Sequence, residues 1–393
     1  MIQSKRLLID GLGLVDGHFS GVGQYILGIL QGFDRLIDTY TSSGIEPPEI
    51  IVVIPYDKVG RFKEFGFKNI RYRRLPIPFR YLASLWHRRW LPPIDIFCGI
   101  GTYLFPRFVD MPLLLSKNGG LIIFDLSYEL HRQYSDEGNA LFLSKRVRES
   151  LKRTRNVITI SENAKREIAD FYDIKPALIS VATPAVNQGT LYRRSPKEIE
   201  EIKIKYGITK KNYILALSNL EPRKNLKALV RSYCSLPKDL QDKFSLVLVG
   251  VSGWKSDALF DEIRTKVAEG HDIIRPSHYV TDVDKPAIIS GSSLLVYPSH
   301  YEGFGMPPLE ALACGVPVIT SDNSSLPEVV EGVGKMVSVS GSTDQLTQSL
   351  KETLENIKDI TRETLKAGPR RASEFSWEKS AQIILDSIQR NVW

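Results

Sequence analysis

Glu302 and Glu310 stand eight residues apart in the segment YEGFGMPPLEALACGVPVITS. A short apolar run, Leu294 to Pro298, precedes the first carboxylate and predicts a strand that ends just before it. The second carboxylate is expected in the first turn of a helix. Carboxylates accept hydrogen bonds from sugar and ribose hydroxyls, and the free N–H groups of a helix N-terminus favour phosphate. The segment therefore suits a sugar nucleotide.

The residues between the two glutamates support this interpretation. Pro307 and Pro308 are well placed to begin the helix, because proline suits the first helical position. Gly303 and Gly305 allow the backbone to approach a ligand closely. A bare pair of glutamates at this spacing would indicate only solvated helix charges. The interpretation therefore depends on the strand, the glycines and the prolines that accompany the pair.

A basic pair, Arg223 and Lys224, follows the predicted strand YILALSNL in the turn LEPRKN. Arginine offers a planar fork of donors and lysine a compact charge, which together can neutralise a diphosphate that a sugar leaves. Catalysis of such transfers depends largely on stabilising charge on the leaving group. A solvated basic turn is the usual alternative. The position at the carboxyl end of a strand, where α/β sheets bind ligands, favours the functional interpretation.

The elements that must position these residues alternate between strand and helix. Apolar runs without alternation fit strands that are buried on both faces of a parallel sheet, and 3.6-residue spacing predicts the helices between them. The predicted strands are LLIDGL, EIIVVIP, LIIFDL, NVITIS, YILALSNL, FSLVLVG, SLLVYPS and VPVITS, and the example helices are Val22 to Phe33, Glu162 to Phe171 and Asn225 to Tyr233. Two doubly wound α/β sheets are the expected outcome.

The length of 393 residues also favours two domains. We expect an N-terminal Rossmann-like domain over residues 1–190 and a C-terminal Rossmann-like domain over residues 191–375, joined within the turn-rich stretch Pro184 to Pro196. Residues 376–393 predict an amphipathic helix after a glycine–proline break at Gly368–Pro369. Sequence alone allows this helix either to stay on the second domain or to cross back to the first.

The segment around the two glutamates resembles the retaining glycosyltransferases of family four, which have the GT-B fold. That family has E-x7-E at this point, and the flanking words YPSHYEGFGMPPLEALACG and VPVITSDNSSLPEVV are also similar. The resemblance covers the second domain strongly, from about Tyr213 to Glu331, and the first domain loosely. It implies two doubly wound Rossmann-like domains that face each other across a cleft, with the acceptor on the first domain and the nucleotide sugar on the second.

The resemblance also implies roles for individual residues. Glu302 would bind hydroxyls of the donor sugar, and Glu310 would bind the ribose hydroxyls. Arg223 and Lys224 would hold the diphosphate. Further substrate contacts are implied at Gly21, Gly23, Asp125, Asn219, Val280, Thr281, Phe304, Gly305 and Met306. Core packing is the alternative for the side chains of Phe304 and Met306.

One position departs from the family's pattern. The segment IIFDLSYE keeps Asp125 but has Phe124 where the family usually has a histidine that contacts the donor sugar. The change implies an altered sugar preference or a lower activity. A non-catalytic, membrane-associated protein that binds a nucleotide sugar is therefore kept as an alternative to an enzyme.

The composition argues against several other classes of protein. No apolar run reaches the roughly 18 residues of a membrane-spanning helix, and the start, MIQSKRLLIDGLG, lacks the features of a signal peptide. Cys98, Cys234 and Cys314 are widely spaced, which fits a reduced cytoplasm. The segment Asp282–Asp284 has the form D-x-D, but Thr281 before it indicates a helix cap instead of a metal site. We therefore expect a cytoplasmic protein that needs no metal and no cofactor.

A basic, aromatic stretch occupies residues 61–90, with nine lysines and arginines against one acid. Clustered cations attract anionic lipid headgroups, and aromatic side chains settle at the membrane interface, so peripheral contact with an anionic membrane is one expectation. A basic loop and helix whose aromatic side chains pack inward is the evenly weighted alternative. Nucleic acid is disfavoured, because no RNA- or DNA-binding module is recognisable.

Together these patterns predict a retaining hexosyltransferase. It would move a hexose from a nucleotide-diphosphate sugar to a glycan or lipid-linked acceptor in bacterial polysaccharide biosynthesis. UDP-glucose and GDP-mannose are the leading donors. A sugar-nucleotide epimerase or phosphorylase on a similar scaffold is the alternative enzyme.

Overall fold

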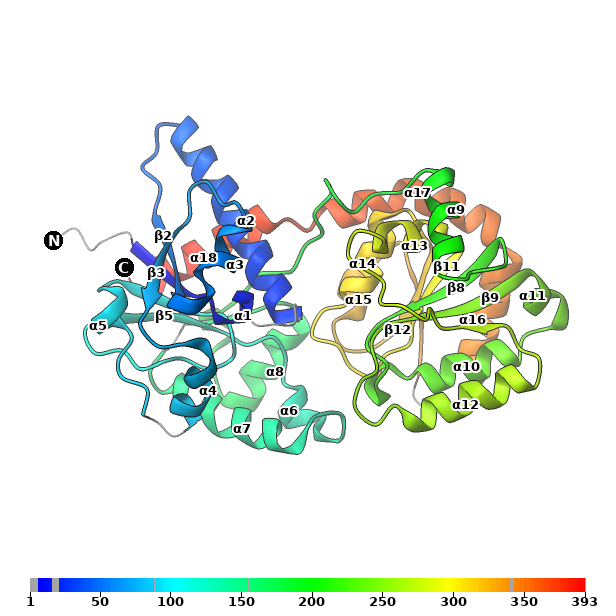
Figure 1. The fold of residues 1–393 in the computed structure, drawn as a ribbon, viewed down its shortest axis with the longest axis horizontal. Helices are drawn as coiled ribbons and strands as arrows, with labels where there is room; N and C mark the ends of the chain where they lie inside the picture. Colours follow the sequence, from blue (N-terminus) through cyan, green and yellow to red (C-terminus); the bar gives the residue numbers. More distant parts are fainter. Residues whose placement is uncertain (1–5, 16–20, 88–89, 155, 340–342, 393) are drawn as a thin grey trace. The chain divides into compact units, whose positions relative to one another are not determined.

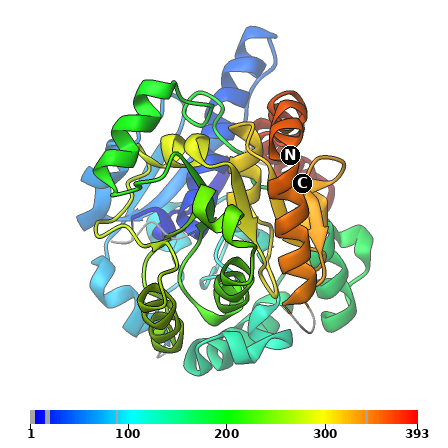
Figure 2. The same cartoon turned by 90° about the vertical axis from the view of Figure 1, so that its right-hand side faces the viewer.

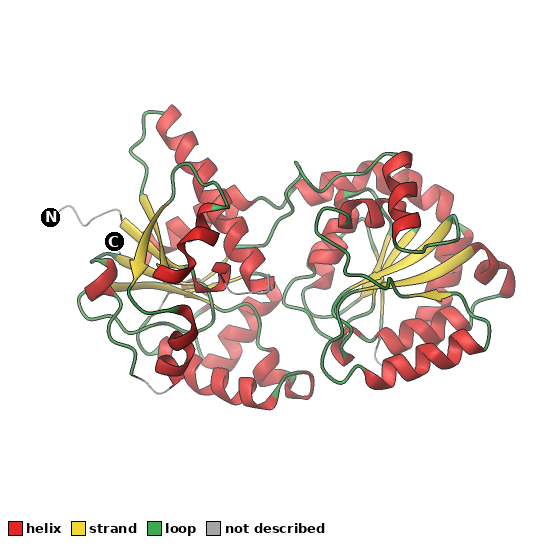
Figure 3. Cartoon of the chain, viewed as in Figure 1, coloured by secondary structure: helices red, strands yellow, loops and turns green. Residues whose placement is uncertain are grey.

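Parallel strands flanked by helices build both halves of the protein, in a computed structural model that describes residues 6–15, 21–87, 90–154, 156–339 and 343–392. The chain divides into an N-terminal unit, Met1–Pro184 with Ser376–Trp393, and a C-terminal unit, Ala185–Phe375. Figure 1 traces the chain by colour, and Figure 3 shows that helices cover both faces of the sheet in each unit. This layering is the α/β architecture that the sequence predicts.

The sheet of the N-terminal unit has seven parallel strands among the described residues, in the order β3-β2-β1-β4-β5-β6-β7. They are β1 (Arg6–Asp10), β2 (Glu49–Pro55), β3 (Arg71–Leu75), β4 (Thr102–Phe105), β5 (Lys117–Ile122), β6 (Val157–Thr159) and β7 (Ile179–Val181). The strands inside the sheet are mostly buried, because helices cover both of its faces.

The helices of this unit include one from the far end of the chain. They are α1 (Leu12–Val15), α2 (Gly21–Ser42), α3 (Val59–Lys63), α4 (Phe79–His87), α5 (Asp95–Cys98), α6 (Ser127–Leu130), α7 (Glu137–Leu151), α8 (Glu162–Tyr172) and α18 (Trp377–Val392). Helix α18 packs on α2, where a Cβ at Gly28 or Gly32 would clash with Trp377. This close approach of the two helices therefore requires glycine at both positions.

The sheet of the C-terminal unit has six parallel strands within the described ranges, in the order β10-β9-β8-β11-β12-β13. They are β8 (Asn212–Leu217), β9 (Phe244–Val249), β10 (Ile273–Ile274), β11 (Leu294–Tyr297), β12 (Val318–Ser321) and β13 (Lys335–Val337). Leu295 of β11 pairs with Leu215 of β8 on one side and with Val318 of β12 on the other. Strand order reverses between β8 and β11, and such a switch point is where open α/β sheets bind ligands.

Helices flank this second sheet on both sides, as Figure 2 also shows. They are α9 (Pro196–Lys205), α10 (Leu226–Cys234), α11 (Lys238–Lys243), α12 (Asp257–Ala268), α13 (Lys285–Gly291), α14 (Met306–Ala313), α15 (Leu326–Val330), α16 (Asp344–Glu355) and α17 (Ile357–Ser373). Helix α9 begins with a capping box in which Ser195 and Glu198 each bind the other's backbone N–H.

The break predicted at Gly368–Pro369 is wrong. Helix α17 continues through Pro369, and the chain leaves the helix only after Ser373. A Cβ at Gly368 would lie 2.6 Å from the carbonyl oxygen of Leu312 on α14. The glycine thus allows α17 to pack closely on α14. We attribute the continuous helix to this packing, which offsets the hydrogen bond that proline removes.

Candidate functional site

The loops that follow β8 and β11 bring a buried carboxylate and two cations together. Oε1 of Glu302 lies 2.6 Å from Nζ of Lys224, and Oε2 lies 3.1 Å from Nη1 of Arg223. Glu302 is only 6% exposed and Lys224 only 7%, so water screens their charges weakly. The residues that the sequence predicted for catalysis therefore form one cluster at the switch point of the sheet.

Hydrogen bonds fix the loop that carries the cations. The backbone N–H of His300 donates to the Arg223 carbonyl over 2.9 Å, which ties the loop after β8 to the loop after β11. Arg223 Nη1 donates to the Tyr301 carbonyl over 2.9 Å. Its Nε and Nη2 donate to one oxygen of Glu221, over 3.1 and 2.9 Å. The guanidinium is therefore oriented by two carboxylates and one carbonyl.

Burial and pairing act in opposite directions on Glu302. Burial would raise the pKa of its carboxyl, but the charges of Lys224 and then Arg223 outweigh burial and hold the pKa at about 2. Burial lowers the pKa of Lys224, and the Glu302 charge opposes that change. The Lys224 ammonium also donates to the hydroxyl of Tyr297 over 3.0 Å. The carboxylate is therefore ionised at neutral pH.

Two serines hold the backbone around Glu302, and sequence reasoning did not single them out. The Glu302 N–H donates to Ser324 Oγ over 3.0 Å. Ser325 Oγ lies 2.9 Å from the Glu302 carbonyl and 2.8 Å from the Phe304 carbonyl. Both serines lie in the segment VPVITSDNSSLPEVV, which resembles the family, but nothing in that pattern indicates that they contact the Glu302 loop.

Glu310 lies in the second turn of α14, because that helix begins at Met306; the prediction that placed it in the first turn is wrong. Its Oε1 lies 2.6 Å from Nζ of Lys285, the first residue of α13. Burial raises the pKa of Glu310, and the Lys285 charge opposes that rise. Sequence reasoning missed Lys285, because no local pattern reports a contact across 25 residues and two helices.

Gly305 supplies a backbone shape that other residues rarely adopt. Its φ is +117°, and a Cβ there would lie 2.7 Å from Leu326 Cδ2. The glycine turns the chain from the Glu302 loop into α14. Next to it, Phe304 is buried with its ring centroid 5.5 Å from that of Phe375, and Met306 is half-buried. The side chain of Phe304 therefore packs in the core, as its alternative interpretation stated.

Three other predicted contact residues lie at loops of the same unit. Asn219 is exposed just after β8, and its carbonyl accepts from the Glu221 N–H over 3.0 Å. Val280 and Thr281 precede α13. Thr281 Oγ1 accepts from the Asp284 N–H over 3.2 Å, so Thr281 caps the turn that leads into the helix. Helix α13 begins at Lys285, so the prediction that Thr281 is its N-cap and that Asp284 lies in its first turn is wrong by three residues.

Gly21, Gly23 and Asp125 belong to the N-terminal unit. Gly21 is exposed at the first residue of α2, and Gly23 is buried in the same turn. Asp125 follows β5, and its Oδ1 accepts from the Ser127 N–H over 2.9 Å, which opens helix α6. Asp125 therefore lies at the carboxyl edge of its sheet, the edge where ligands bind, whereas Gly21 and Gly23 are separated from β1 by α1.

Phe124, the departure from the family's pattern, is part of an aromatic cluster. Its ring centroid lies 5.1 Å from that of Tyr25 and 5.3 Å from that of Phe108. Tyr25 in turn packs edge-on against Trp377 of α18 and donates its hydroxyl to the Ala182 carbonyl. Phe124 is only 7% exposed, so here an apolar side chain is integrated into the core.

Within the described parts of the chain, no group of three or more His, Cys, Asp or Glu side chains is arranged to hold a metal ion. Asp284 of the D-x-D segment instead accepts from Lys205 over 2.7 Å and from the Tyr206 hydroxyl over 2.6 Å. No helix among those residues is both long and apolar enough to cross a bilayer.

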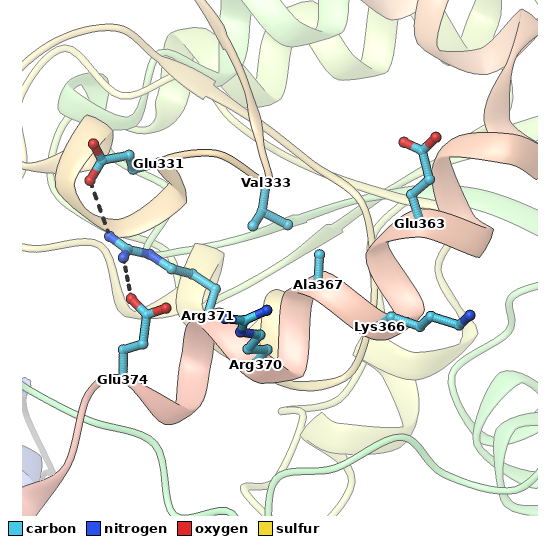
Figure 4. Close-up of a pocket in the computed structure, with 8 residues that line it drawn as sticks. All are labelled: Glu331, Val333, Glu363, Lys366, Ala367, Arg370, Arg371 and Glu374. Carbon is cyan, nitrogen blue, oxygen red and sulfur yellow. Dashed lines mark hydrogen bonds and ion pairs between the residues drawn. The ribbon is translucent and has the colours of Figure 1, made fainter.

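A pocket of about 510 Å³ is lined by residues other than the predicted site residues, and Figure 4 shows its lining. Arg371 of α17 pairs there with Glu374 and, at 3.8 Å, with Glu331. Its guanidinium also donates to the carbonyls of Glu328 and Val329 near the end of α15. The pocket is lined by Glu331, Val333, Glu363, Lys366, Ala367, Arg370, Arg371 and Glu374. Arg371 therefore makes structural contacts with its guanidinium, and none of the predicted site residues lines the pocket.

Known proteins similar to this chain include bacterial mannosyltransferases. O-antigen chain mannosyltransferase B of Escherichia coli is 34% identical over 255 residues, which cover 65% of this chain and 65% of that protein. The serotype-specific mannosyltransferase WbdA of Escherichia coli is 28% identical over 239 residues, 60% of this chain. That match spans only 28% of WbdA. The matched region is therefore less than two thirds of either relative.

A solved structure and a family model identify the fold and the domain. HepE of Anabaena, in complex with UDP and glucose, has a TM-score of 0.69 and 14% identity, covering 98% of this chain and 99% of that chain. This likeness confirms the GT-B fold, which consists of two α/β domains, each with a parallel sheet. Residues 198–369 match the family model of the glycosyl transferases group 1. The chain thus carries a glycosyl transferases group 1 domain, and the resemblance to family four is confirmed at that level.

Proposed function

We propose that this protein is a retaining hexosyltransferase. It moves a hexose from a nucleotide-diphosphate sugar to a glycan or lipid-linked acceptor in bacterial polysaccharide biosynthesis. The observation that carries the proposal is the buried cluster of Arg223, Lys224 and Glu302 at the switch point of a glycosyl transferases group 1 domain. The names of the similar O-antigen chain enzymes support the polysaccharide role.

The two cations serve the leaving group in this proposal. As the bond between the sugar and the diphosphate breaks, negative charge grows on the diphosphate oxygen. Arg223 presents a fork of donors and Lys224 a point charge, and both stabilise that charge best where water is excluded. The weak exposure of Lys224 and the partial burial of Arg223, whose side chain is 21% exposed, fit this role.

Glu302 binds hydroxyls of the donor sugar, and Glu310 binds the ribose. Both are buried carboxylates, each ion-paired with at least one lysine, so each is held in one orientation. The backbone around Gly305 approaches the sugar and phosphate, and the loop at Val280 and Thr281 lines the base. Gly21, Gly23 and Asp125 contribute from the N-terminal domain, which takes the acceptor.

Retention follows a same-face route. The bond from the anomeric carbon to the diphosphate breaks, the acceptor oxygen bonds to that carbon from the same face, and the acceptor proton passes to the leaving phosphate. A two-carboxylate displacement would need a free carboxylate as nucleophile. Glu302 does not suit that role, because Lys224 and Arg223 already engage both of its oxygens.

The donor is GDP-mannose in this proposal, with UDP-glucose as the second choice. The mannosyltransferase names of the relatives favour mannose. No metal is required, because Arg223 and Lys224 counter the diphosphate charge. Addition of a chelator should therefore leave turnover unchanged.

The protein works in the cytoplasm at the inner face of a membrane, close to a lipid-linked acceptor. The basic stretch of residues 61–90 provides the attraction to anionic lipid. Part of its aromatic content packs inward: Phe62 is 4% exposed, and its ring contacts those of Phe65, Phe67 and Tyr72.

Turnover of labelled donors tests the proposal. The purified protein is incubated with GDP-mannose or UDP-glucose and a lipid-linked or glycan acceptor, and products are identified by mass spectrometry. We expect transfer or slow donor hydrolysis, with retained configuration by NMR. Arg223→Ala should remove most turnover, at least 100-fold, because one charge-stabilising donor contributes about that factor. Near-normal turnover in this variant would refute the phosphate role.

Two rival functions give different products. An epimerase or phosphorylase would yield an epimerised nucleotide sugar or a sugar phosphate. A non-catalytic binding protein would bind the donor and never consume it with any acceptor; Phe124 in place of histidine keeps this rival in the test. Either outcome would replace the transferase proposal.

A further inference from the structure

Five large apolar side chains lie exposed near one another on the N-terminal unit. They belong to α5, to the turn after it and to the loop before β5. The exposed fractions are 57% for Ile96, 45% for Phe97, 58% for Ile100, 64% for Leu114 and 66% for Leu115. We call these five residues the α5 surface (α5 is labelled in Figure 1). Contiguous apolar groups on a protein surface indicate a site of interaction.

Hydrogen bonds hold the two segments of the α5 surface together. The Asp95 carboxylate, 3% exposed, accepts from the N–H groups of Leu114 (3.0 and 3.1 Å), Leu115 (2.8 Å) and Ser116 (2.8 Å). The Gly101 N–H donates to Ser116 Oγ over 3.3 Å. Asp95 opens α5, so the same residue that begins the helix presents Leu114 and Leu115 beside it. The display of apolar groups is therefore fixed by buried polar contacts.

Arginines border the α5 surface. Helix α5 packs on the edge strand β3, where Cys98 Sγ lies 3.9 Å from the Arg74 carbonyl. Arg71, Arg73 and Arg74 are all exposed on that strand. Arg71 pairs with Glu49 at 2.9 Å. In the part of the chain that the structure describes, no carboxylate lies within ion-pair distance of Arg73 or Arg74. Positive charge thus accompanies the apolar groups.

Edge strands often carry charge to prevent pairing with other chains, and this accounts for the arginines alone. It does not account for five exposed apolar side chains beside them. A second copy of the chain, docked on the same surface by a two-fold axis, would place arginines against arginines. The charge therefore favours an anionic partner that also accepts apolar side chains.

We propose that the α5 surface, with Arg73 and Arg74, docks on an anionic lipid bilayer. The apolar side chains enter the boundary between headgroups and acyl chains, and the arginines pair with lipid phosphates. Only the arginines fall within residues 61–90; the apolar anchor lies outside that stretch. Thr102 of β4 pairs with Lys117 of β5, the first residues of their strands, so the α5 surface is at the amino edge of the sheet.

Sedimentation with vesicles tests the proposal without any enzymatic activity. The full chain is mixed with vesicles of phosphatidylcholine alone or with phosphatidylglycerol added, at low and high salt. We expect binding to the anionic vesicles that falls as salt rises, and little binding to the neutral ones. Leu114→Ser with Leu115→Ser should lower the partition coefficient roughly tenfold or more. Arg73→Gln with Arg74→Gln should also lower it roughly tenfold.

Matched control variants remove two exposed apolar side chains or two exposed arginines outside the α5 surface. Leu141→Ser with Val283→Ser changes two apolar side chains that are 58% and 83% exposed, and Arg166→Gln with Arg362→Gln removes two exposed arginines. Both controls should bind vesicles as the unchanged protein does. Thermal unfolding checks that every variant is folded. We expect little change in stability, because all the substituted side chains are exposed.

Two results would overturn the proposal. One is equal vesicle binding by the Leu114–Leu115 variant and its control. The other is a protein that ignores anionic vesicles but forms a dimer in light scattering, which the same variant converts to monomer. The second result would assign the α5 surface to a second copy of the chain.

Discussion

Glu302 keeps its charge in a place that water barely reaches, because two cations surround it. Its pKa is held at about 2, against an ordinary value of 4.5. A lowered carboxyl pKa stabilises the folded state above the unfolded-state pKa, and that stabilisation disappears as the pH falls through the folded-state pKa. The contribution of Glu302 is therefore complete above about pH 4.5 and is lost between about pH 4.5 and about pH 2.

Glu302→Gln should lower the free energy of unfolding by roughly 3 kcal/mol at pH 7, because Lys224 would be left buried without its counter-charge. The difference from the unchanged protein should shrink as the pH falls below about 4.5. Urea unfolding followed at several pH values measures this. Glu355→Gln removes an exposed carboxylate and is the control, with a change under about 0.5 kcal/mol. A loss that does not vary with pH would contradict the account.

Lys285 controls the charge of Glu310. Burial raises the Glu310 pKa, and the lysine 2.6 Å away opposes the rise. In Lys285→Met the pKa should rise further, so the carboxylate protonates nearer neutral pH and binds ribose hydroxyls less well. We expect nucleotide-sugar affinity to fall roughly tenfold below neutral pH and to recover as the pH rises. Calorimetric titration across pH measures this, with Lys285→Arg as the charge-preserving control. A loss equal at every pH would indicate packing alone.

The site could be predicted only in part from the sequence. Arg223, Lys224 and Glu302 were found because each follows an apolar strand, and strand ends share one edge of a parallel sheet. Lys285 was not found, because a lysine that opens a helix looks like any solvated charge. Ser324 and Ser325 were missed for a related reason: their partners are backbone atoms of a loop about 20 residues earlier.

Helix α14 begins where it does because Gly305 turns the chain into it. Any other residue at position 305 would have an unfavourable φ of +117°, and its Cβ would lie 2.7 Å from Leu326 Cδ2. Gly305→Ala should therefore lower the free energy of unfolding by about 2 kcal/mol and displace the Glu302 loop. Gly207, with φ of +68° and open space around it, is the control.

Gly207→Ala should cost about 1 kcal/mol, from backbone strain alone. Urea unfolding compares the two variants, and donor turnover reports on the displaced loop. An equal cost at Gly305 and Gly207, with turnover unchanged, would show that the turn at Gly305 does not position the site.

Strand prediction succeeded for long apolar runs and was less successful elsewhere: β4 (Thr102–Phe105) was missed although all of it is buried, and the predicted strand LIIFDL overlaps β5 only at Leu121 and Ile122. β2 was predicted with its observed bounds, Glu49–Pro55, since the sheet buries it on both faces. β3 was missed, because it is an edge strand whose sequence RYRRL is mostly exposed. Pro369 gave a false helix end, since packing of Gly368 on α14 is invisible in a local pattern.

At the scale of the whole molecule, the chain ends in the unit where it began. Trp377, 6% exposed, fills the space that Gly28 and Gly32 leave on α2. Trp377→Ala should lower the stability of the N-terminal unit by about 3–5 kcal/mol, the usual cost of a large cavity. Calorimetry should show the transition of that unit at a lower temperature, and the transition of the C-terminal unit should not move. Trp90→Ala, at a side chain 69% exposed, is the control. A shift in both transitions would show that the terminal helix stabilises more than its own unit.

The direct test of the account is the contribution of Arg223 to diphosphate binding. Calorimetric titration compares GDP with GMP in the unchanged protein and in Arg223→Gln, a variant that keeps side-chain polarity without charge. The account predicts that the change weakens GDP binding at least tenfold and GMP binding far less, since a charged hydrogen-bonded contact contributes about 1.5–3 kcal/mol. Equal weakening of both nucleotides, or none, would contradict the claim that this buried cluster holds the diphosphate of the donor.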